Sequence, residues 1–208
     1  MVKIILIRHA DYVTESSPSF LGISNNNSLT KKGITQATLL ATYLKKNYPT
    51  LQQITSSDLK RSLQTASIIA SKFGSEVLVD ETFREINFGI FEGLTMEEAE
   101  DTYPKTFQER QNDKINFVVP EGESYKDVYE RIHPAFNKII QLKSDDVVAI
   151  ITHATVIKIL SMFYLNMRQE EVDKIHYNHC SLSVIDFNCD KEYFINKYNY
   201  LDFLGDTK

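Results

Sequence analysis

Two arginines and two histidines stand where their side chains could hold a compact anion. Arg8 and His9 directly follow one apolar run, His153 follows a second, and Arg61 comes shortly after a third. In an open α/β sheet, ligands gather at the carboxyl ends of the strands. Guanidinium groups and imidazoles donate strong hydrogen bonds to phosphate oxygens. These residue types at these positions predict a phosphate-binding site.

Each of these residues, taken alone, has an ordinary structural explanation. A histidine at the end of a strand more often packs or caps than reacts, and a single arginine such as Arg8 more often forms a surface ion pair. The combination is harder to explain in this way. An Arg-His pair, a second arginine and a second histidine at equivalent strand ends indicate one shared site.

The elements that must position these residues alternate along the chain. Continuous apolar, β-branched runs and shorter alternating runs predict strands at residues 2–7, 53–55, 76–79, 147–152, 182–187 and 193–198. Capping residues and helical periodicity predict helices at residues 30–46, 59–73, 95–103, 124–142 and 155–165. Pro134 should kink the fourth of these helices. The alternation predicts an α/β fold with three layers, α/β/α, around a mostly parallel sheet, in a single domain over residues 1–208.

Composition narrows the classes of function. The net charge of −5 argues against nucleic-acid and polybasic membrane partners, which select for basic surfaces. No apolar stretch approaches the roughly 20 residues that a membrane-spanning helix needs. Cys180 and Cys189 are too few for a disulfide scaffold, so we expect a cytoplasmic protein.

A set of short motifs resembles those of the histidine phosphatases, the family that includes the cofactor-dependent phosphoglycerate mutases. The motifs are Leu6–Ala10, Leu29-Thr30 with Gly33, Ser56–Arg61, Gln64–Ala66, Arg84-Glu85, Phe88-Gly89, Glu92-Gly93, Pro120–Ser124 and Thr152-His153. They occur in the family's order from residue 4 to about 155, and the segment from Cys180 to Val184 resembles the family's last strand region. One such motif is a weak signal, whereas the ordered set is specific. The resemblance also implies a phosphoglycerate mutase-like fold.

The resemblance implies catalysis through a phosphohistidine, with no metal and no cofactor. His9 would attack phosphorus, and Glu85 would protonate the leaving oxygen and then activate water. Arg8, Arg61 and His153 would complete the catalytic set by holding the phosphoryl oxygens. The substrate-binding residues are then expected to be Arg8, Arg61, His153, Thr155 and Gly22.

Three positions depart from the family pattern. Ala10 stands where many members have glycine, and its methyl group is tolerable if the backbone angle is ordinary. Glu15 stands where many members place a phosphate-contacting asparagine, so the loop folds differently or that contact is absent. After His153, Ala154 and Thr155 replace a glycine-containing sequence. We expect Thr155 to cap the following helix and leave its N-terminus directed at the pocket.

One further group of residues superficially suggests a metal site. His176, His179 and Cys180 lie close together in the sequence, but no second cluster of ligands accompanies them. We expect surface or packing roles for them.

Hydrolysis of small phosphorylated metabolites is the expected activity. Mutases of the family generally carry a longer insertion between the acid and the second histidine, and a longer tail. The segment at residues 94–119 should form a helical cap facing the substrate, with contacts available from Tyr103, Phe107, Arg110, Lys114 and Phe117. Sugar phosphates, phosphoglycerates and ribazole phosphate all stay open as substrates, and a homodimer stays open as the assembly. Two alternatives remain: a cofactor-dependent phosphoglycerate mutase, and a catalytically weak phosphate-binding regulatory module.

Overall fold

Six strands form one sheet in the part of the chain that the computed structural model describes, which is residues 1–14, 20–143, 145–188, 190 and 192–207. The strands are β1 (Val2–Arg8), β2 (Leu51–Ser56), β3 (Val77–Val79), β4 (Val147–Thr152), β5 (Leu182–Phe187) and β6 (Tyr193–Tyr200). Their order across the sheet is β3-β2-β4-β1-β5-β6. Every strand predicted from the sequence is present; β1, β2 and β6 are longer than predicted, and β3 is shorter.

The sheet is mostly parallel, as predicted. β1 and β2 both pair in parallel with β4, and β3 pairs in parallel with β2. β5 pairs antiparallel with β1, and β6 pairs antiparallel with β5 to form the closing hairpin at one end of the sheet. The central position of β4 and β1 brings the carboxyl ends of these two strands next to each other.

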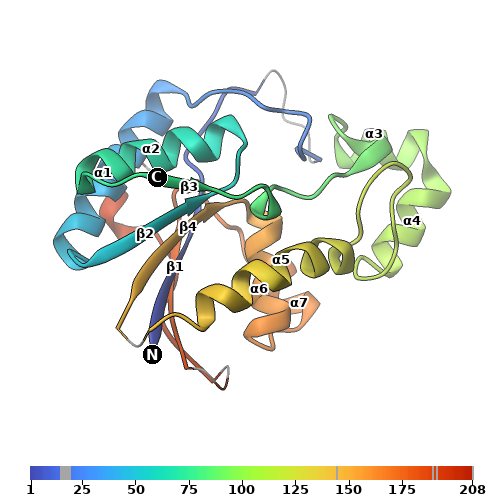
Figure 1. Ribbon diagram of the computed structural model, residues 1–208. Helices are drawn as coiled ribbons and strands as arrows, with labels where there is room; N and C mark the ends of the chain where they lie inside the picture. The colour runs from blue at the N-terminus through green and yellow to red at the C-terminus, as the bar shows by residue number, and fades with distance from the viewer. Residues whose placement is uncertain (15–19, 144, 189, 191, 208) are drawn as a thin grey trace.

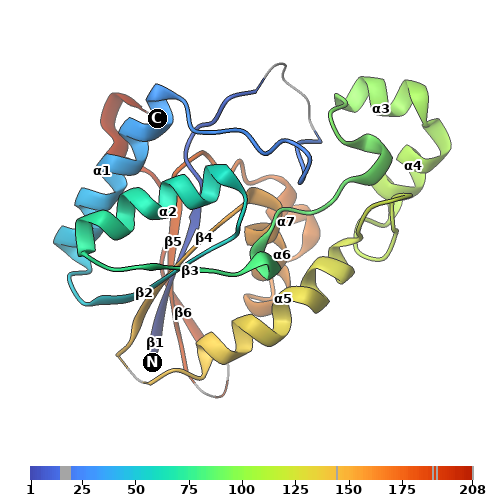
Figure 2. The ribbon, with the colours of Figure 1, turned by 45° about the horizontal axis from the view of Figure 1, so that its top comes forward.

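Helices cover both faces of the sheet and give the predicted three layers (Figures 1 and 2). α1 (Lys31–Asn47) and α2 (Lys60–Phe73) lie on one face, and α5 (Tyr125–Ile140) and α6 (Ala154–Tyr164) lie on the other. The alternating side chains of β1 separate the two cores: Ile5 belongs to the α1/α2 core, and Ile4 belongs to the α5/α6 core. A strand buried in this way on both faces reads as a continuous apolar run.

Local signals set most helix ends where they were predicted. The Thr30 side chain caps α1 by accepting a hydrogen bond from the Gly33 amide at 3.0 Å. Ser124 opens α5 with a capping box. α2 ends at Gly74, whose φ of 66° is the left-handed conformation that glycine adopts without cost. α5 continues through Pro134 without interruption of the helix.

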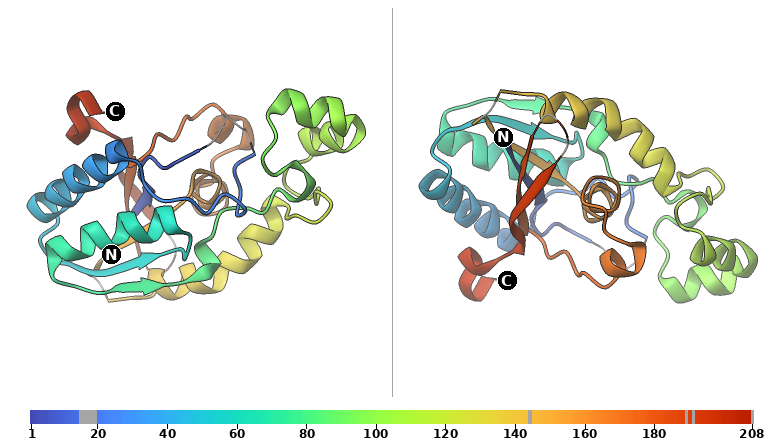
Figure 3. Two further views of the ribbon diagram at one scale, coloured as in Figure 1. Left: turned by 90° about the horizontal axis from the view of Figure 1, so that it is seen from above. Right: turned by 90° about the horizontal axis from the view of Figure 1, so that it is seen from below.

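Of two further short helices, one was predicted only as part of the helical cap at residues 94–119 and the other was not predicted. α4 (Pro104–Asn112) follows α3 (Met96–Thr102), and together they form a small unit that projects beside the three layers (Figure 3). Pro104 is tolerated because it is the first residue of α4, where no helical N–H bond is lost. α7 (Gln169–Asp173) follows α6. In the described residues, no helix is long and apolar enough to cross a membrane.

Candidate active site

The two predicted strand-end histidines meet at the carboxyl edge of the sheet. Arg8 pairs with Thr152 in the register of β1 and β4, so His9 and His153 each follow the last paired residue of their strand. The His9 amide donates to the Thr152 carbonyl at 3.0 Å. The centroids of the two imidazole rings are 5.1 Å apart.

The His9 ring is oriented by two polar contacts. Its Nδ1 lies 2.9 Å from the carbonyl oxygen of Ala10, which fixes the proton on Nδ1 and leaves the lone pair on Nε2. Arg61 donates from Nε to that Nε2 at 3.2 Å. Ala10 itself is fully buried and does not have a positive φ, so the expectation that a methyl group fits here is confirmed.

A pocket of about 320 Å³ opens over His9. It is lined by Arg8, His9, Tyr12, Leu21, Arg61, Glu85, Phe88, Ala154, Thr155 and His176. Five of the predicted site residues are therefore brought to one pocket. The other two lie against it: His153 is buried beside His9, and Gly22 presents its carbonyl to the Arg61 guanidinium at 3.0 Å.

Both arginines of the pocket are held without a carboxylate partner. Arg61 is only 1% exposed, donates to the carbonyls of Gly22 and Asn25, and lies 4.9 Å from the centroid of the Tyr12 ring. Arg8 donates to the carbonyl of Tyr177, and its Nε is buried without a hydrogen-bond partner in the described chain. Neither arginine forms an ion pair with a described residue, so the pocket keeps an excess of positive charge.

The pKa values of the two histidines fall well below 6.5. Burial is the main cause for His9, and Arg61, His153 and Arg8 lower its pKa further. Burial and the same arginines lower the pKa of His153. Both imidazoles are therefore neutral at neutral pH. A neutral His9 that keeps its lone pair on Nε2 is the form that can act as a nucleophile once the Arg61 hydrogen bond is released.

His153 keeps an unused polar atom. Its Nε2 lies 2.8 Å from the Ser57 hydroxyl and 3.3 Å from that of Ser62, but its Nδ1 is buried with no partner in the described chain. A buried polar atom without a partner costs free energy unless a ligand satisfies it. Like Arg8 Nε, this atom is a buried polar group that no described residue satisfies.

Glu85 is buried in the same pocket and has the environment of an acid. Its side chain accepts from the Ile86 amide at 2.9 Å and from the Thr155 amide at 3.4 Å. Burial raises the pKa of Glu85, while those two backbone contacts and the arginines oppose the shift. A carboxyl group with a raised pKa can carry a proton to a leaving oxygen.

The expectation that Thr155 caps α6 is wrong. The residue with the cap conformation is His153, and its side chain makes no capping hydrogen bond. Thr155 is already the second helical residue, so its free amide faces Glu85. The helix N-terminus does reach the pocket, since both Ala154 and Thr155 line it.

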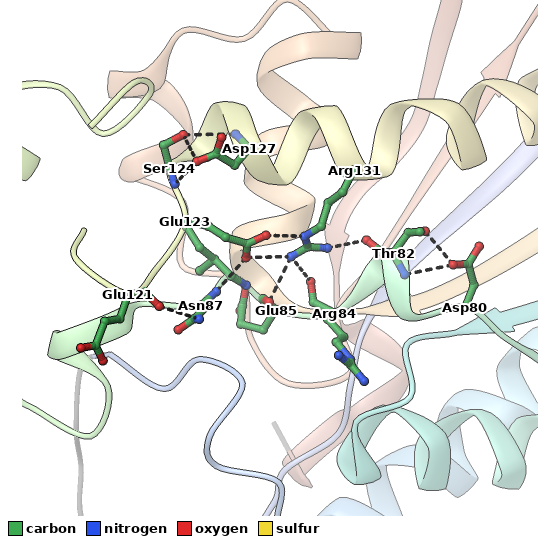
Figure 4. A network of polar contacts seen from close by, with 11 residues as sticks. Asp80, Thr82, Arg84, Glu85, Asn87, Glu121, Glu123, Ser124, Asp127 and Arg131 are labelled. Carbon is green, nitrogen blue, oxygen red and sulfur yellow. Dashed lines mark hydrogen bonds and ion pairs between the residues drawn. The ribbon is translucent and has the colours of Figure 1, made fainter. Parts of the chain in front are cut away.

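A polar network holds the backbone that carries Glu85 (Figure 4). Arg131 of α5 donates to the carbonyls of Thr82, Arg84 and Glu85, the last two at 2.9 and 3.1 Å. Arg131 also forms an ion pair with Glu123 at 2.8 Å. A second clamp, Asp58, accepts two hydrogen bonds from the Arg84 guanidinium. The residues of the Arg84-Glu85 and Glu123 motifs therefore hold the backbone at Glu85 in place.

Glu92 fixes the loop that carries Gly22. Its carboxylate accepts from the amides of Ile23 at 2.9 Å, Ser24 at 2.7 Å and Phe88 at 3.1 Å. A Cβ on Gly22 would lie 1.9 Å from Glu92 Oε1 and 2.6 Å from the Ile86 carbonyl oxygen. Glycine is required here by close approach, and this gives the Gly22 carbonyl its place beside Arg61.

The sequence did not point to His179 and His176 as parts of the site. The His179 ring centroid is 5.4 Å from that of His9, and its Nδ1 is 3.4 Å from Asp11. Burial and Arg8 lower the pKa of His179 to about 3. His176 lines the pocket. The signal that could have located them is the strand pairing, because the Cys180 amide donates to the carbonyls of both Arg8 and His9.

Glu15 and Cys189 lie outside the described residues, so the structure does not address the departure at Glu15.

The predicted helical cap does not line the pocket itself, because no described residue of the pocket lining comes from residues 94–119. This segment reaches the site indirectly, through Arg110, whose guanidinium lies 5.3 Å from the centroid of the Phe88 ring. Among the described residues, no cluster of three His, Cys, Asp or Glu side chains has the arrangement of a metal site.

Known proteins share this sequence and fold. The chain is 33% identical over 150 residues to fructose-2,6-bisphosphatase of Saccharomyces cerevisiae, a match that spans 72% of this chain and only 32% of that protein. It is 28% identical over 187 residues to a probable phosphoglycerate mutase, GpmB, of Yersinia pestis, spanning 90% of this chain and 86% of the relative. A crystal structure of phosphoserine phosphatase from Entamoeba histolytica, in complex with 3-phosphoglyceric acid, superposes with a TM-score of 0.82. It is 24% identical and covers 98% of this chain and 100% of that one.

The family model agrees with the residues that form the pocket. It matches residues 4–200, a range that contains most of β1, Arg8, His9, the helix that carries Arg61, Glu85, and β4 with the following His153. The motifs found in the sequence, the fold and the match over nearly the whole chain lead to the same conclusion. This protein belongs to the histidine phosphatase superfamily, branch 1.

Proposed function

We propose that this protein hydrolyses phosphomonoesters of small metabolites through a phosphorylated His9. One observation carries the proposal: a neutral, oriented imidazole faces a buried pocket whose two guanidinium groups have no carboxylate partner. Such a pocket is complementary to a phosphoryl group, and its unpartnered Arg8 Nε and His153 Nδ1 would be satisfied by phosphoryl oxygens.

The first step forms a bond between His9 Nε2 and phosphorus and breaks the bond between phosphorus and the ester oxygen. Arg61 donates to Nε2 in the free protein and would pass to a phosphoryl oxygen when the ester binds. Glu85 gives its proton to the departing oxygen, so the alcohol leaves neutral. Arg8, Arg61 and His153 hold the three phosphoryl oxygens as charge shifts among them.

The second step returns both residues to their starting states. Glu85, now a carboxylate, takes a proton from a water molecule as the water oxygen attacks phosphorus. The bond from phosphorus to His9 breaks, and inorganic phosphate is released. Neither step uses a metal ion or a cofactor.

Phosphate release from a panel of phosphomonoesters, measured with EDTA present, tests the proposal. We expect turnover by the wild type and none by His9→Ala. His133→Gln is the matched histidine control, because His133 lies in α5 against Tyr164 and Asn137 and not in the pocket. A phosphoryl adduct on His9, detected by mass spectrometry at alkaline pH, would identify the nucleophile. Equal turnover by wild type and His9→Ala, or inhibition by EDTA, would overturn the mechanism.

A phosphoglycerate mutase is the second candidate, favoured by the similarity to the probable mutase GpmB. A mutase would use the same His9 but return the phosphoryl group to a bound intermediate instead of to water. The same panel separates the two. Transfer between the 2- and 3-positions of phosphoglycerate, stimulated by a bisphosphorylated primer and without phosphate release, would favour the mutase. Uptake of phosphorylated ligand with neither reaction would favour the binding module.

A further inference from the structure

The guanidinium of Arg8 depends for its orientation on a loop outside the helices and strands. Among the described residues, the Tyr177 carbonyl is the acceptor that the Arg8 side chain contacts. Tyr177 lies between α7 and β5, in a segment that is neither helix nor strand. Its neighbour His176 lines the phosphate pocket. The contacts that fix this loop therefore also fix one cation of the pocket and part of the pocket wall.

A chain of three hydroxyl groups anchors the Tyr177 side chain to α6. Ser161 donates to the Ile157 carbonyl at 2.8 Å, so its oxygen accepts from the Tyr198 hydroxyl, at 2.7 Å. Tyr198 has then used its own proton, and its oxygen accepts from the Tyr177 hydroxyl. Burial raises the pKa of Tyr177, which keeps this donor protonated. The chain ties the residue that contacts Arg8 to the helix whose first residues line the pocket.

A β-bulge in β6 brings Tyr198 into this chain. Ser183 of β5 faces two residues of β6, Tyr198 and Asn199, where a regular pair would have one. Asn199 has a φ of 47°, the left-handed conformation, and its amide donates to the Ser183 hydroxyl at 3.0 Å. In a regular strand, Tyr198 and Tyr200 would point to the same face of the sheet. With the bulge, Tyr198 packs against the α5/α6 core, whereas Tyr200 packs against the α1/α2 core. The bulge therefore turns Tyr198 toward α6 and Tyr177.

Asn199, the second residue of the bulge, holds the same loop. Its side-chain amide donates to the His176 carbonyl at 2.9 Å. One residue of the bulge thus contacts the backbone of His176, and the other contacts the phenol of Tyr177. From this arrangement we infer that the bulge is a positioning device for Arg8, in which Tyr198 and Asn199 fix the loop that directs the guanidinium at the phosphoryl group. The inference rests on the proposed function, which gives Arg8 that role.

Removal of single hydroxyl groups tests the positioning role. Tyr198→Phe breaks the chain between Tyr177 and α6. The dissociation constant of inorganic phosphate, measured by calorimetry, should then rise about fivefold, the factor that one net hydrogen bond supplies. Tyr193→Phe is the matched control, because Tyr193 lies on the same strand and loses a hydroxyl that donates to the Leu165 carbonyl at 2.8 Å. The phosphate affinity of this control should stay within about twofold of the wild type.

A double variant separates positioning from stability. In Tyr198→Phe, the Tyr177 hydroxyl is buried without its partner, which lowers the free energy of unfolding. Tyr177→Phe added to Tyr198→Phe removes that unpaired hydroxyl, so urea unfolding should show that part of the stability is regained. The tie between the loop and α6 is still broken, and phosphate affinity should therefore stay as low as in Tyr198→Phe. Recovery of phosphate affinity together with stability would overturn the positioning role.

The remaining outcomes distinguish this inference from the proposed function. An unchanged phosphate affinity in Tyr198→Phe, or an equal loss in Tyr193→Phe, would overturn the positioning role and leave the proposed hydrolysis standing. The expected losses of phosphate affinity in a protein that releases phosphate from no ester would support the positioning role and overturn the hydrolysis. A wild type that neither binds phosphate nor releases it from an ester would overturn both.

Discussion

Arg61 and His9 share a hydrogen bond in which the guanidinium Nε donates to the imidazole Nε2 at 3.2 Å. A cation that donates to this atom opposes its protonation, and burial acts in the same direction. The contact therefore keeps the candidate nucleophile unprotonated until a phosphoryl group takes the place of the nitrogen as acceptor. In the proposed mechanism, the Arg61 guanidinium donates to His9 in the free protein and to a phosphoryl oxygen when the ester is bound.

The pH profile of the rate should reflect two shifted pKa values, that of His9 below the value of a free histidine and that of Glu85 above the value of a free glutamate. Catalysis needs His9 neutral and Glu85 protonated. Because the pKa of His9 lies well below 6.5, the acid limb should appear only far below that pH. Because the pKa of Glu85 is raised above 4.5, the rate for alkyl esters should fall as pH rises through that raised value. Initial rates of kcat/KM across pH check both limbs.

Glu85→Gln separates the two limbs. The amide cannot donate a proton, so kcat/KM for an alkyl phosphate, which reports the first step and not the later attack by water, should fall about 10²–10⁴-fold. p-Nitrophenyl phosphate, whose leaving group needs no proton, should lose far less. An equal loss for both esters would remove Glu85 from the role of acid.

The free energy of unfolding should fall as the solution is acidified below pH 6.5. The unfolded chain binds a proton at His9 and at His153 below that pH, whereas the folded chain does not until much lower pH. Each buried histidine therefore contributes a slope of about 1.4 kcal/mol per pH unit. Glu85 acts in the opposite sense above 4.5, because the folded state keeps a proton that the unfolded state loses. His179, whose pKa is lowered to about 3, adds a third slope of the same sign, and three histidines outweigh one carboxyl group.

Urea unfolding of the wild type and His153→Gln at several pH values between 4.5 and 6.5 measures this slope. The variant should show a slope smaller by about 1.4 kcal/mol per pH unit, since it lacks one of the three histidines with a lowered pKa. Parallel slopes would mean that His153 titrates in the folded protein as it does in the unfolded chain.

Arg131 should act on turnover through the backbone that carries Glu85. Arg131→Lys keeps a charge for Glu123 but loses the planar donor set that reaches the carbonyls of Thr82, Arg84 and Glu85. We expect kcat to fall about tenfold or more, as a small misplacement of an acid does, and KM to stay within about twofold. The alkaline limb of the pH profile should move to lower pH, because a looser Glu85 is more hydrated.

Lys126→Met is the matched control for Arg131→Lys. Lys126 lies on the same helix, and its one ion pair with a described residue is with the exposed Glu130, at 3.9 Å. A merely structural role for Arg131 would lower the free energy of unfolding without moving the pH limb or separating kcat from KM.

Gly22→Ala should damage both stability and phosphate binding. The added methyl would overlap Glu92 Oε1 and the Ile86 carbonyl, so the loop must shift, at a cost of about 1–3 kcal/mol in the free energy of unfolding. The Gly22 carbonyl would then move away from Arg61, and phosphate affinity should fall. Ser24→Ala on the same loop removes only an exposed hydroxyl and should change neither quantity. Thermal unfolding with and without phosphate compares the two variants.

Sequence was sufficient where a short motif and a strand end coincide. β1 and β4 are apolar runs of unmistakable type, and each is followed at once by a histidine. Because parallel neighbours end at one edge, the meeting of His9 and His153 follows from the fold class alone. Caps such as Thr30 and Ser124 act within one helical turn, which explains why they could be predicted from neighbouring residues.

Sequence was insufficient where position depends on distant pairing. His179 comes beside His9 only because β5 runs antiparallel to β1 and the Cys180 amide meets the carbonyls of Arg8 and His9. The predicted cap of α6 was Thr155, because threonine favours the cap position near a helix start. The actual cap is His153, which has the extended backbone of that position. α4 and α7 are short, and their apolar residues are too few to show a period.

The register between β1 and β4 also limits how sequences of this kind can diverge. One inserted residue in either strand would displace its histidine by about 3.3 Å and turn it to the other face of the sheet. A compensating insertion in the neighbouring strand would not restore the site, because β2 and β5 are paired to the same two strands. Length changes are therefore confined to the loops and to the unit formed by α3 and α4. The positions of His9 and His153 are therefore set by the sheet, whereas the length and sequence of the segments around the pocket can vary.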